Sequence, residues 1–385
     1  MYIKGVGCTR FCIEQSQFYK MISDAVSEAL DDAGISLREI DFLVSSNNHL
    51  ASNGERQRHP SSLLSSILGV DIPILNIQTS CDGGSSALWT ALSLGSGDND
   101  GDSNNLNNLH NFLVIGFDRM VSNTAKILND ELMMDSENIY HQSEGVNPHV
   151  QNAFIAQQYI DMHGATKEDF SLVAFKNHEN GFLNPKARFY KKKITLKQIR
   201  DSPVVASPLR LFDCSTPANG AAAVILSKEK TDIEIAGSGF SVDRLPVFES
   251  SDLTSWSSAK KAAEQAFREA KITPADIDIA EVHDAFTPAE IIAYEDIGFA
   301  KKGEGYKLIR DKSTFLDGKI PVNTSGGLKA KGHPISATGL SQIYELTKQL
   351  RNEAGERQVS NPKYALSHNI GGAGSSSVVH ILRKV

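Results

Sequence analysis

The chain has 385 residues, of which 40% are hydrophobic and 22% are charged, and this is the composition of an ordinary soluble globular protein. Its formal net charge of −7 argues against nucleic acid as the main partner, so an anionic ligand needs a local cluster of basic side chains. No apolar run approaches the roughly 20 residues that span a bilayer, so we expect no membrane partner. The N-terminal MYIKGVGCTRF lacks the apolar core of a signal peptide, and the C-terminal ILRKV is not a peroxisomal address.

The cysteine content favours a reducing, cytoplasmic compartment. Four cysteines in a chain of this length are too few and too scattered for a disulfide framework. Cys8 and Cys12 are four residues apart, but no second Cys/His pair at zinc spacing accompanies them. We therefore expect no metal site.

The first predicted elements place a cysteine at a strand-to-helix junction. Residues 29–44 (ALDDAGISLREIDFLV) predict the end of an amphipathic helix, a short turn and a strand. An apolar run at 72–77 predicts another strand, and a helix follows from Asp82. Cys81 lies between the two, where the unpaired N–H groups of the first helical turn favour a thiolate. The alternative is a small buried cysteine, which is the usual place of an unpaired one.

The middle of the chain predicts a loop and an insertion. Residues 95–111 (GSGDNDGDSNNLNNLHN) are polar and of low complexity, which predicts an exposed loop. Residues 119–205 predict an inserted, mostly helical subdomain, and they include the basic run ARFYKKKITLKQIR. This run supplies the charge that an anionic ligand needs, although a solvated charged face is an equal alternative. Its basic residues are Arg188, Lys191, Lys192, Lys193, Lys197 and Arg200.

The next elements repeat those of the first half. Residues 266–282 (AFREAKITPADIDIAEV) match the helix–turn–strand pattern above at a constant shift of 237 positions, from Ala29 to Ala266 and from Asp41 to Asp278. The halves also end alike, in NGAAAVILSKE and AGSSSVVHILRK. The sequence therefore predicts two duplicated α/β units packed face to face, with helices buried between two sheets. The predicted division is 1–118 with 206–230 for the first unit, 119–205 for the inserted loop subdomain, and 231–385 for the second unit.

Three histidine-bearing stretches follow in the second half. AEVHDAF places His283 at a strand end, where α/β proteins often hold ligand groups. GGLKAKGHPISATG places His333 in a glycine-rich loop, and ALSHNIGGAGSSS places His368 and Asn369 at another strand end. One such histidine is more often a loop or capping residue, but three of them beside Cys81 indicate acyl transfer by a thiolate and a histidine. Glycine-rich loops also supply N–H groups for the oxyanion of an attacked thioester.

These motifs resemble the thiolase superfamily along nearly the whole chain, and they look closest to archaeal acetyl-CoA acetyltransferases and the sterol-carrier-protein type. The resemblance rests on SCDGGSSAL around Cys81, HDAF at 283–286, GHPISATG at 332–339 and NIGGAG at 369–374. It implies a layered α-β-α-β-α fold with an inserted subdomain that covers coenzyme A. It also implies coenzyme A thioesters as substrates and no tightly bound cofactor.

The resemblance implies a role for each motif residue. Cys81 would take the acyl group, and His333 would accept its proton. His283 stands where many thiolases have asparagine, and it would bind the thioester oxygen with a water. The backbone N–H groups of Cys81 and Gly372 would form a second oxyanion hole. Ser215 would contact the pantetheine arm, unless it only forms a turn, and the basic run would bind the coenzyme A phosphates.

The chain departs from the family at the base that moves the substrate α-proton. Most thiolases have a second cysteine before IGG, where this chain has Asn369, and the sterol-carrier type has one inside HDCF, where this chain has Ala285. Asn369 cannot remove a proton, although its amide can donate to an oxyanion. Cys214 and His368 are close to motif positions and are candidates, and the sequence leaves the base open.

The leading hypothesis is an acetyl-CoA C-acetyltransferase, which condenses two acetyl-CoA to acetoacetyl-CoA or runs the reverse thiolysis. One alternative is an enzyme like 3-hydroxy-3-methylglutaryl-CoA synthase, whose glutamate base would be Glu55, although the histidine motifs favour a thiolase. Another is a non-catalytic thiolase-like scaffold, which the missing second cysteine supports. Thiolases are dimers or tetramers, so we expect a homodimer or homotetramer. The archaeal relatives often work beside a hydroxymethylglutaryl-CoA synthase, bridged by a zinc-containing OB-fold protein, a contact that nothing in this sequence shows.

Overall fold

The computed structural model of the chain describes residues 1–14, 17–51, 56–96, 109–121 and 125–385. Most of the predicted polar loop at 95–111, and Glu55, lie outside these described residues. No helix among the described residues has both the length and the apolar content needed to cross a membrane.

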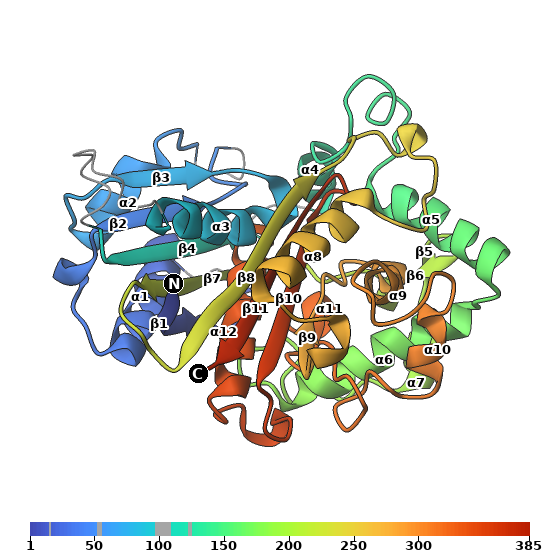
Figure 1. The fold of residues 1–385 in the computed structure, drawn as a ribbon. Helices are drawn as coiled ribbons and strands as arrows, with labels where there is room; N and C mark the ends of the chain where they lie inside the picture. Colours follow the sequence, from blue (N-terminus) through green and yellow to red (C-terminus); the bar gives the residue numbers. More distant parts are fainter. Residues whose placement is uncertain (15–16, 52–55, 97–108, 122–124) are drawn as a thin grey trace.

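The first half is a sheet with helices on both faces (Figure 1). Its elements are β1 (Tyr2–Cys8), α1 (Phe18–Ala33), β2 (Phe42–Ser46), α2 (Pro60–Leu68), β3 (Ile74–Ile77), α3 (Gly83–Gly95), β4 (Asn111–Arg119) and β7 (Asn219–Ser227). The strand order is β3-β2-β4-β7-β1, with β2 parallel to both of its neighbours and β7 antiparallel to β4 and β1.

The second half repeats this plan. Its elements are β8 (Ile233–Val242), α8 (Ser257–Ala270), β9 (Ile279–Glu281), α9 (Thr287–Asp296), α10 (Gly305–Arg310), α11 (Gly327–Ala330), α12 (Thr338–Leu350), β10 (Tyr364–Gly371) and β11 (Ser376–Lys384). The strand order is β8-β11-β10-β9. Tyr2 pairs with Glu234 and Ile3 with Ile233, so β1 and β8 join the strands of the two halves into one continuous sheet. The two predicted sheets are therefore not separate.

The duplication is present in three dimensions. The Asp41 carboxylate accepts two backbone N–H groups at the start of β4, at 2.7 and 2.9 Å. Its counterpart Asp278 accepts two at the start of β10, at the same distances. A Cβ on Gly5 in β1, or on Gly237 in β8, would overlap a backbone carbonyl of α1 or α8. Glycine therefore lets the first strand and first helix of each half pack closely.

Buried apolar side chains divide the two halves into layers. Helices α3 and α12 lie in the middle, where Leu88, Leu340 and Ile343 belong to one buried cluster with residues of both halves. Helices α1 and α2 pack on the outer face of the first half, and α8 and α9 on that of the second. This is the α-β-α-β-α arrangement, with the helix starts of α3 and α12 brought together at the centre.

The segment between β4 and β7 is mostly helical. It contains α4 (Ala125–Met133), α5 (Pro148–His163), α6 (Lys167–Leu183), α7 (Leu196–Arg200) and the short strands β5 (Val204–Ala206) and β6 (Leu209–Arg210). Tyr159 and Phe170 from this segment are buried in one cluster with Phe286 and Ile291 of the second half. The inserted helices therefore pack onto α9, beside the end of β9.

Candidate active site

Cys81 lies in the 3₁₀ turn Ser80–Asp82, between β3 and α3, at the junction that the sequence predicts. Ser80 has a φ of 62°, a left-handed conformation that is strained for a residue other than glycine. A Cβ on Gly84 would overlap the backbone carbonyl of Ser336. The start of α3 therefore packs directly against the loop that follows His333.

The sulfur of Cys81 borders a pocket with about 850 Å³ of empty space, its open mouth included. Side chains from both halves and from the inserted segment line this pocket, which is typical of a small-molecule site. The predicted site residues among them are Cys81, Ser215, His283, His333 and Gly372. The apolar lining comes from Met120, Leu128, Leu132, Ala285, Phe286 and Ile335.

Cys81, His283 and His333 form one cluster. The sulfur and one nitrogen of each ring lie within 4.8 Å of one another, and the two rings meet edge to face with 5.3 Å between centroids. Among the described residues, this is the one such group whose atoms lie close enough together to hold a metal ion. A cysteine beside two histidines is equally the set that acyl transfer through a covalent cysteine needs.

The hydrogen bonds of His333 assign it the tautomer of a base. Its Nδ1 lies 2.7 Å from the Thr338 hydroxyl oxygen, and that hydroxyl donates to the Pro334 carbonyl at 3.0 Å. Since the hydroxyl has one proton, its oxygen accepts the Nδ1 proton, and Nε2 keeps a free lone pair. Burial lowers the pKa of His333 to about 3, so the ring is neutral near pH 7. The lone pair of Nε2 is therefore free to accept a hydrogen bond or a proton.

His283 has the opposite tautomer. Its Nδ1 lies 2.9 Å from the Asn369 amide nitrogen, which also faces the Gln342 side-chain oxygen at 3.4 Å. Because an amide nitrogen only donates, Nδ1 of His283 accepts, and the ring proton is on Nε2. Burial lowers the pKa of His283 well below its usual value, so the ring stays neutral. Asn369 thus orients a hydrogen-bond donor, the Nε2–H of His283, in the pocket.

Cys81 is a thiol in the resting site, which corrects the expectation that the helix start favours a thiolate. Burial raises the pKa of Cys81 well above its usual value, and the neighbouring carboxylates of Asp135 and Asp82 add to the rise. These effects outweigh the helix N-terminus. A thiol in such surroundings needs a neighbouring base before its sulfur can act as a nucleophile.

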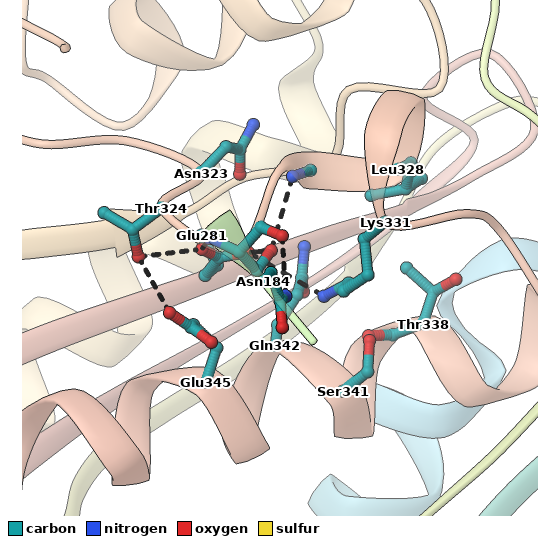
Figure 2. Close-up of polar contacts among 12 residues, drawn as sticks. Asn184, Glu281, Asn323, Thr324, Leu328, Lys331, Thr338, Ser341, Gln342 and Glu345 are labelled. Carbon is teal, nitrogen blue, oxygen red and sulfur yellow. Dashed lines mark hydrogen bonds and ion pairs between the residues drawn. The ribbon is translucent and has the colours of Figure 1, made fainter. Parts of the chain in front are cut away.

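Buried polar side chains connect β9 to the loop before α11. The Glu281 carboxylate accepts the Ser325 N–H at 2.9 Å, and Figure 2 shows the Lys331 ammonium facing Glu281, at 3.9 Å from its oxygen. Asp284 accepts the Leu328 N–H at 2.7 Å. His283 is two residues after Glu281, and His333 is two residues after Lys331. These contacts therefore help to hold the two histidine rings in place relative to each other.

The two candidates for the α-proton base are poorly suited to that role. Cys214 lines the pocket, but its sulfur lies 3.5 Å from the Arg210 carbonyl, and burial raises its pKa to about 12. His368 is fully buried and does not line the pocket, and its ring nitrogens have no hydrogen-bond partner among the described residues. Ser215 lines the pocket, and its N–H donates to the Ala285 carbonyl at 2.7 Å.

One residue of the basic run, Arg188, contacts a residue that lines the pocket. Arg188 donates to the carbonyl of Pro217 at 3.1 Å, and Pro217 lines the pocket. Lys191 borders a separate depression, where its ammonium lies 3.6 Å from the Glu356 carboxylate. Arg188 therefore lies next to a lining residue, but neither Arg188 nor the lysine triplet Lys191, Lys192 and Lys193 is among the lining residues.

Sequence motifs did not reveal every pocket residue. Asp135 and His149, both from the inserted segment, line the pocket and belong to no motif above. Thr338 is inside GHPISATG, but its role as the partner of His333 depends on a contact five residues along the chain. Thr338 could have been found as a hydroxyl residue about one helical turn after a histidine in a loop. No comparable sequence pattern points to Asp135.

The site is therefore a cysteine at a helix start beside two neutral histidines of opposite tautomer, between two duplicated α/β halves. Residues 239–384 match the family described as Thiolase C-terminal domain-like. The chain is 36% identical to an acetyl-CoA acetyltransferase of Methanothermobacter thermautotrophicus, over 99% of this chain and 98% of that one. It is 33% identical to the non-specific lipid-transfer protein-like 2 of Caenorhabditis elegans, over 100% and 96% of the two chains. The chain belongs to the thiolase superfamily.

Solved structures show the same fold. The Ltp2-ChsH2(DUF35) aldolase superposes with a TM-score of 0.83 at 21% identity, over 100% of this chain and 97% of that one. Human mitochondrial 3-ketoacyl-CoA thiolase superposes with a TM-score of 0.74 at 16% identity, over 100% and 98%. At these identities the likeness describes the fold and not the reaction.

Proposed function

We propose that the protein is an acetyl-CoA C-acetyltransferase, which condenses two acetyl-CoA to acetoacetyl-CoA and coenzyme A, or runs the reverse thiolysis. The observation that carries the proposal is the cluster of Cys81 with two histidines in opposite tautomers. One histidine accepts a proton and the other donates one, which is what acyl transfer followed by carbon–carbon bond formation needs. The acetyl-CoA acetyltransferases among the relatives support acetyl-CoA as the substrate.

In the first step, the Cys81 sulfur attacks the thioester carbonyl carbon while Nε2 of His333 takes the thiol proton. The bond to the coenzyme A sulfur then breaks, and the leaving thiolate takes the proton back from His333. The N–H groups of Cys81 and Gly372 are proposed to stabilise the oxyanion, and both residues border the pocket. In the second step, Nε2–H of His283 stabilises the enolate oxygen of the incoming acetyl-CoA.

Coenzyme A is the ligand that we propose for the pocket, bound only as a substrate. The apolar lining suits the pantetheine arm, which Ser215 is proposed to contact, and Arg188, bonded to the lining residue Pro217, is proposed to supply positive charge for the phosphates. The family resemblance supports a homodimer or homotetramer in the cytoplasm, and a contact with hydroxymethylglutaryl-CoA synthase through a zinc-containing OB-fold protein. Light scattering of the purified protein tests the oligomeric state.

Transfer of radiolabelled acetyl from acetyl-CoA to Cys81, located by peptide digestion, tests the proposed function. We expect label on Cys81 and formation of acetoacetyl-CoA, and we expect Cys81→Ala to lose both. The condensation rate of Cys81→Ala should fall by orders of magnitude, because the covalent step is lost. Absence of label in the parent protein would favour the scaffold reading instead. Release of a hydroxymethylglutaryl product from acetoacetyl-CoA and acetyl-CoA would favour the synthase reading.

A further inference from the structure

We propose that the carboxylate of Asp135 is the base that removes the α-proton of the second acyl-CoA. This is the step for which the chain lacks the usual second cysteine. The inference rests on the proposed function and assigns a catalytic residue to the same site.

Asp135 is anchored beside the nucleophile. It follows α4 in the inserted segment and lines the pocket with Cys81, His283 and Gly372. Its Oδ1 accepts a hydrogen bond from the Ser80 hydroxyl at 2.7 Å, and that hydroxyl oxygen lies 3.8 Å from the Cys81 sulfur. Within the described part of the chain, no hydrogen bond occupies Oδ2. The Ser80 hydroxyl thus fixes one carboxylate oxygen, and the other, which no described residue holds, is the one that we assign to the substrate.

The environment makes this carboxylate more basic than an exposed one. Burial raises the pKa of Asp135, which strengthens it as a proton acceptor. The donor that an enolate needs is in the same pocket, at Nε2–H of His283. Enolisation requires a base that takes the proton from the α-carbon and a hydrogen-bond donor to the thioester oxygen.

The proposed step is balanced in protons and electrons. Asp135 takes a proton from the α-carbon of acetyl-CoA, and the electron pair of that bond forms the enolate. The enolate carbon attacks the acyl carbon on Cys81, and the carbon–sulfur bond breaks with its electrons on sulfur. The proton on Asp135 then returns to the Cys81 thiolate through the Ser80 hydroxyl, which lies between the two groups.

The other titratable groups of the pocket are less suited. His283 carries its ring proton on Nε2, His333 serves Cys81, and Cys214 has a pKa of about 12. His149 is the competitor, because burial lowers its pKa and keeps it neutral, and it packs edge to face on Phe286 with 5.4 Å between centroids. A neutral imidazole can also take a proton, so the experiment has to separate His149 from Asp135.

The experiment separates acylation from α-proton removal. Acylation is read as the acetyl mass gained by the intact protein, and α-proton removal as deuterium entering the methyl group of acetyl-CoA in D₂O. We expect Asp135→Asn, which keeps an acceptor for Ser80, to acylate within about threefold of the parent. Deuterium exchange and condensation should both fall by about 100-fold or more, which is the usual loss for a general base. Asp135→Glu should recover at least a tenth of the parent exchange.

Three outcomes overturn the assignment. The first is equal loss of acylation and exchange in Asp135→Asn, which is the mark of a residue that only positions the turn. The second is exchange within tenfold of the parent. The third is exchange that persists in Asp135→Asn but disappears in His149→Gln. A parent protein that never acquires the acetyl group overturns the proposed function together with this inference. The three outcomes above concern the variants only, and in each of them the parent protein is still acylated at Cys81.

Discussion

At the scale of single residues, the proposed mechanism depends on two imidazoles that differ in which nitrogen bears the proton. Thr338 and Asn369 make that difference, because one accepts from Nδ1 and the other donates to it. We predict that Thr338→Val slows acylation of Cys81 by about 100-fold or more, since the wrong tautomer of a catalytic histidine is severely damaging. Rapid-quench measurement of acetyl transfer checks this. Thr338→Ser should keep most of the rate, and a Val variant as fast as the parent would contradict the tautomer argument.

His283 should tolerate a substitution that keeps a donor. His283→Asn places an amide N–H near the thioester oxygen, so we predict that much of the condensation activity remains. His283→Ala removes the donor, and the loss of one such donor typically costs 100- to 1000-fold, or about 3 to 4 kcal/mol. Steady-state condensation rates of the two variants check the prediction. Equal losses in both would argue against a role on the oxygen.

The pKa of Cys81 should respond to the charge beside it. Because the Asp135 carboxylate raises the pKa of the thiol, a neutral amide at this position should lower that pKa. At a pH below the thiol pKa, a lower pKa means more thiolate, so iodoacetamide should label Cys81 faster in Asp135→Asn than in the parent. Labelling rates between pH 7 and 10 check the sign. Slower labelling in the variant would show that Asp135 does not face the sulfur as a charge.

The motif residues were predictable from the sequence, but their protonation was not. Cys81, His283 and His333 are marked by glycines and strand ends that local pattern reveals. The state of Cys81 depends on Asp135, which lies 54 positions further along the chain and reaches the sulfur only through the fold of the inserted segment. Electrostatic partners brought together by tertiary structure leave no periodic signal.

At the scale of elements, the contact between α3 and the loop after His333 positions the nucleophile against its base. A Cβ on Gly84 would overlap the Ser336 carbonyl, and backbone cannot move aside as a side chain can. We predict that Gly84→Ala lowers the thermal midpoint and slows acylation. Gly95→Ala is the matched control in the same helix, since its added Cβ first meets the flexible end of Met1. Calorimetry and acetyl transfer check both, and an equal effect of the two changes would contradict this account.

The pairing of elements was predictable only within each half. Helix–turn–strand repeats reveal the duplication because Asp41 and Asp278 perform the same task at equivalent turns. The junction between the halves is a different matter. It consists of two residue pairs between β1 and β8, which are separated by more than 200 positions. The alternation of inward and outward side chains along each strand is the same whether or not the two strands pair, so the sequence pattern does not predict the pairing.

At the scale of the whole molecule, an acidic chain has to attract a ligand with several phosphates, so its local positive charge should matter. The structure separates the basic run into Arg188, next to a residue that lines the pocket, and Lys191, in another depression beside Glu356. A direct contact should act on binding at any ionic strength, whereas distant exposed charges are screened over about 10 Å at 0.1 M salt.

We therefore predict that Arg188→Gln raises the KM for coenzyme A several-fold at both low and moderate salt, with little change in kcat, because the contact is made equally in the ground and transition states.

The matched control changes Lys191, Lys192 and Lys193 together to serine. It should raise KM mainly at low salt and flatten the salt dependence, and dephospho-coenzyme A should be penalised less than the full cofactor. Thiolysis kinetics with acetoacetyl-CoA at two ionic strengths check both variants. If KM stays within error of the parent in both at low ionic strength, the basic run is a solvated face and the phosphates are bound elsewhere.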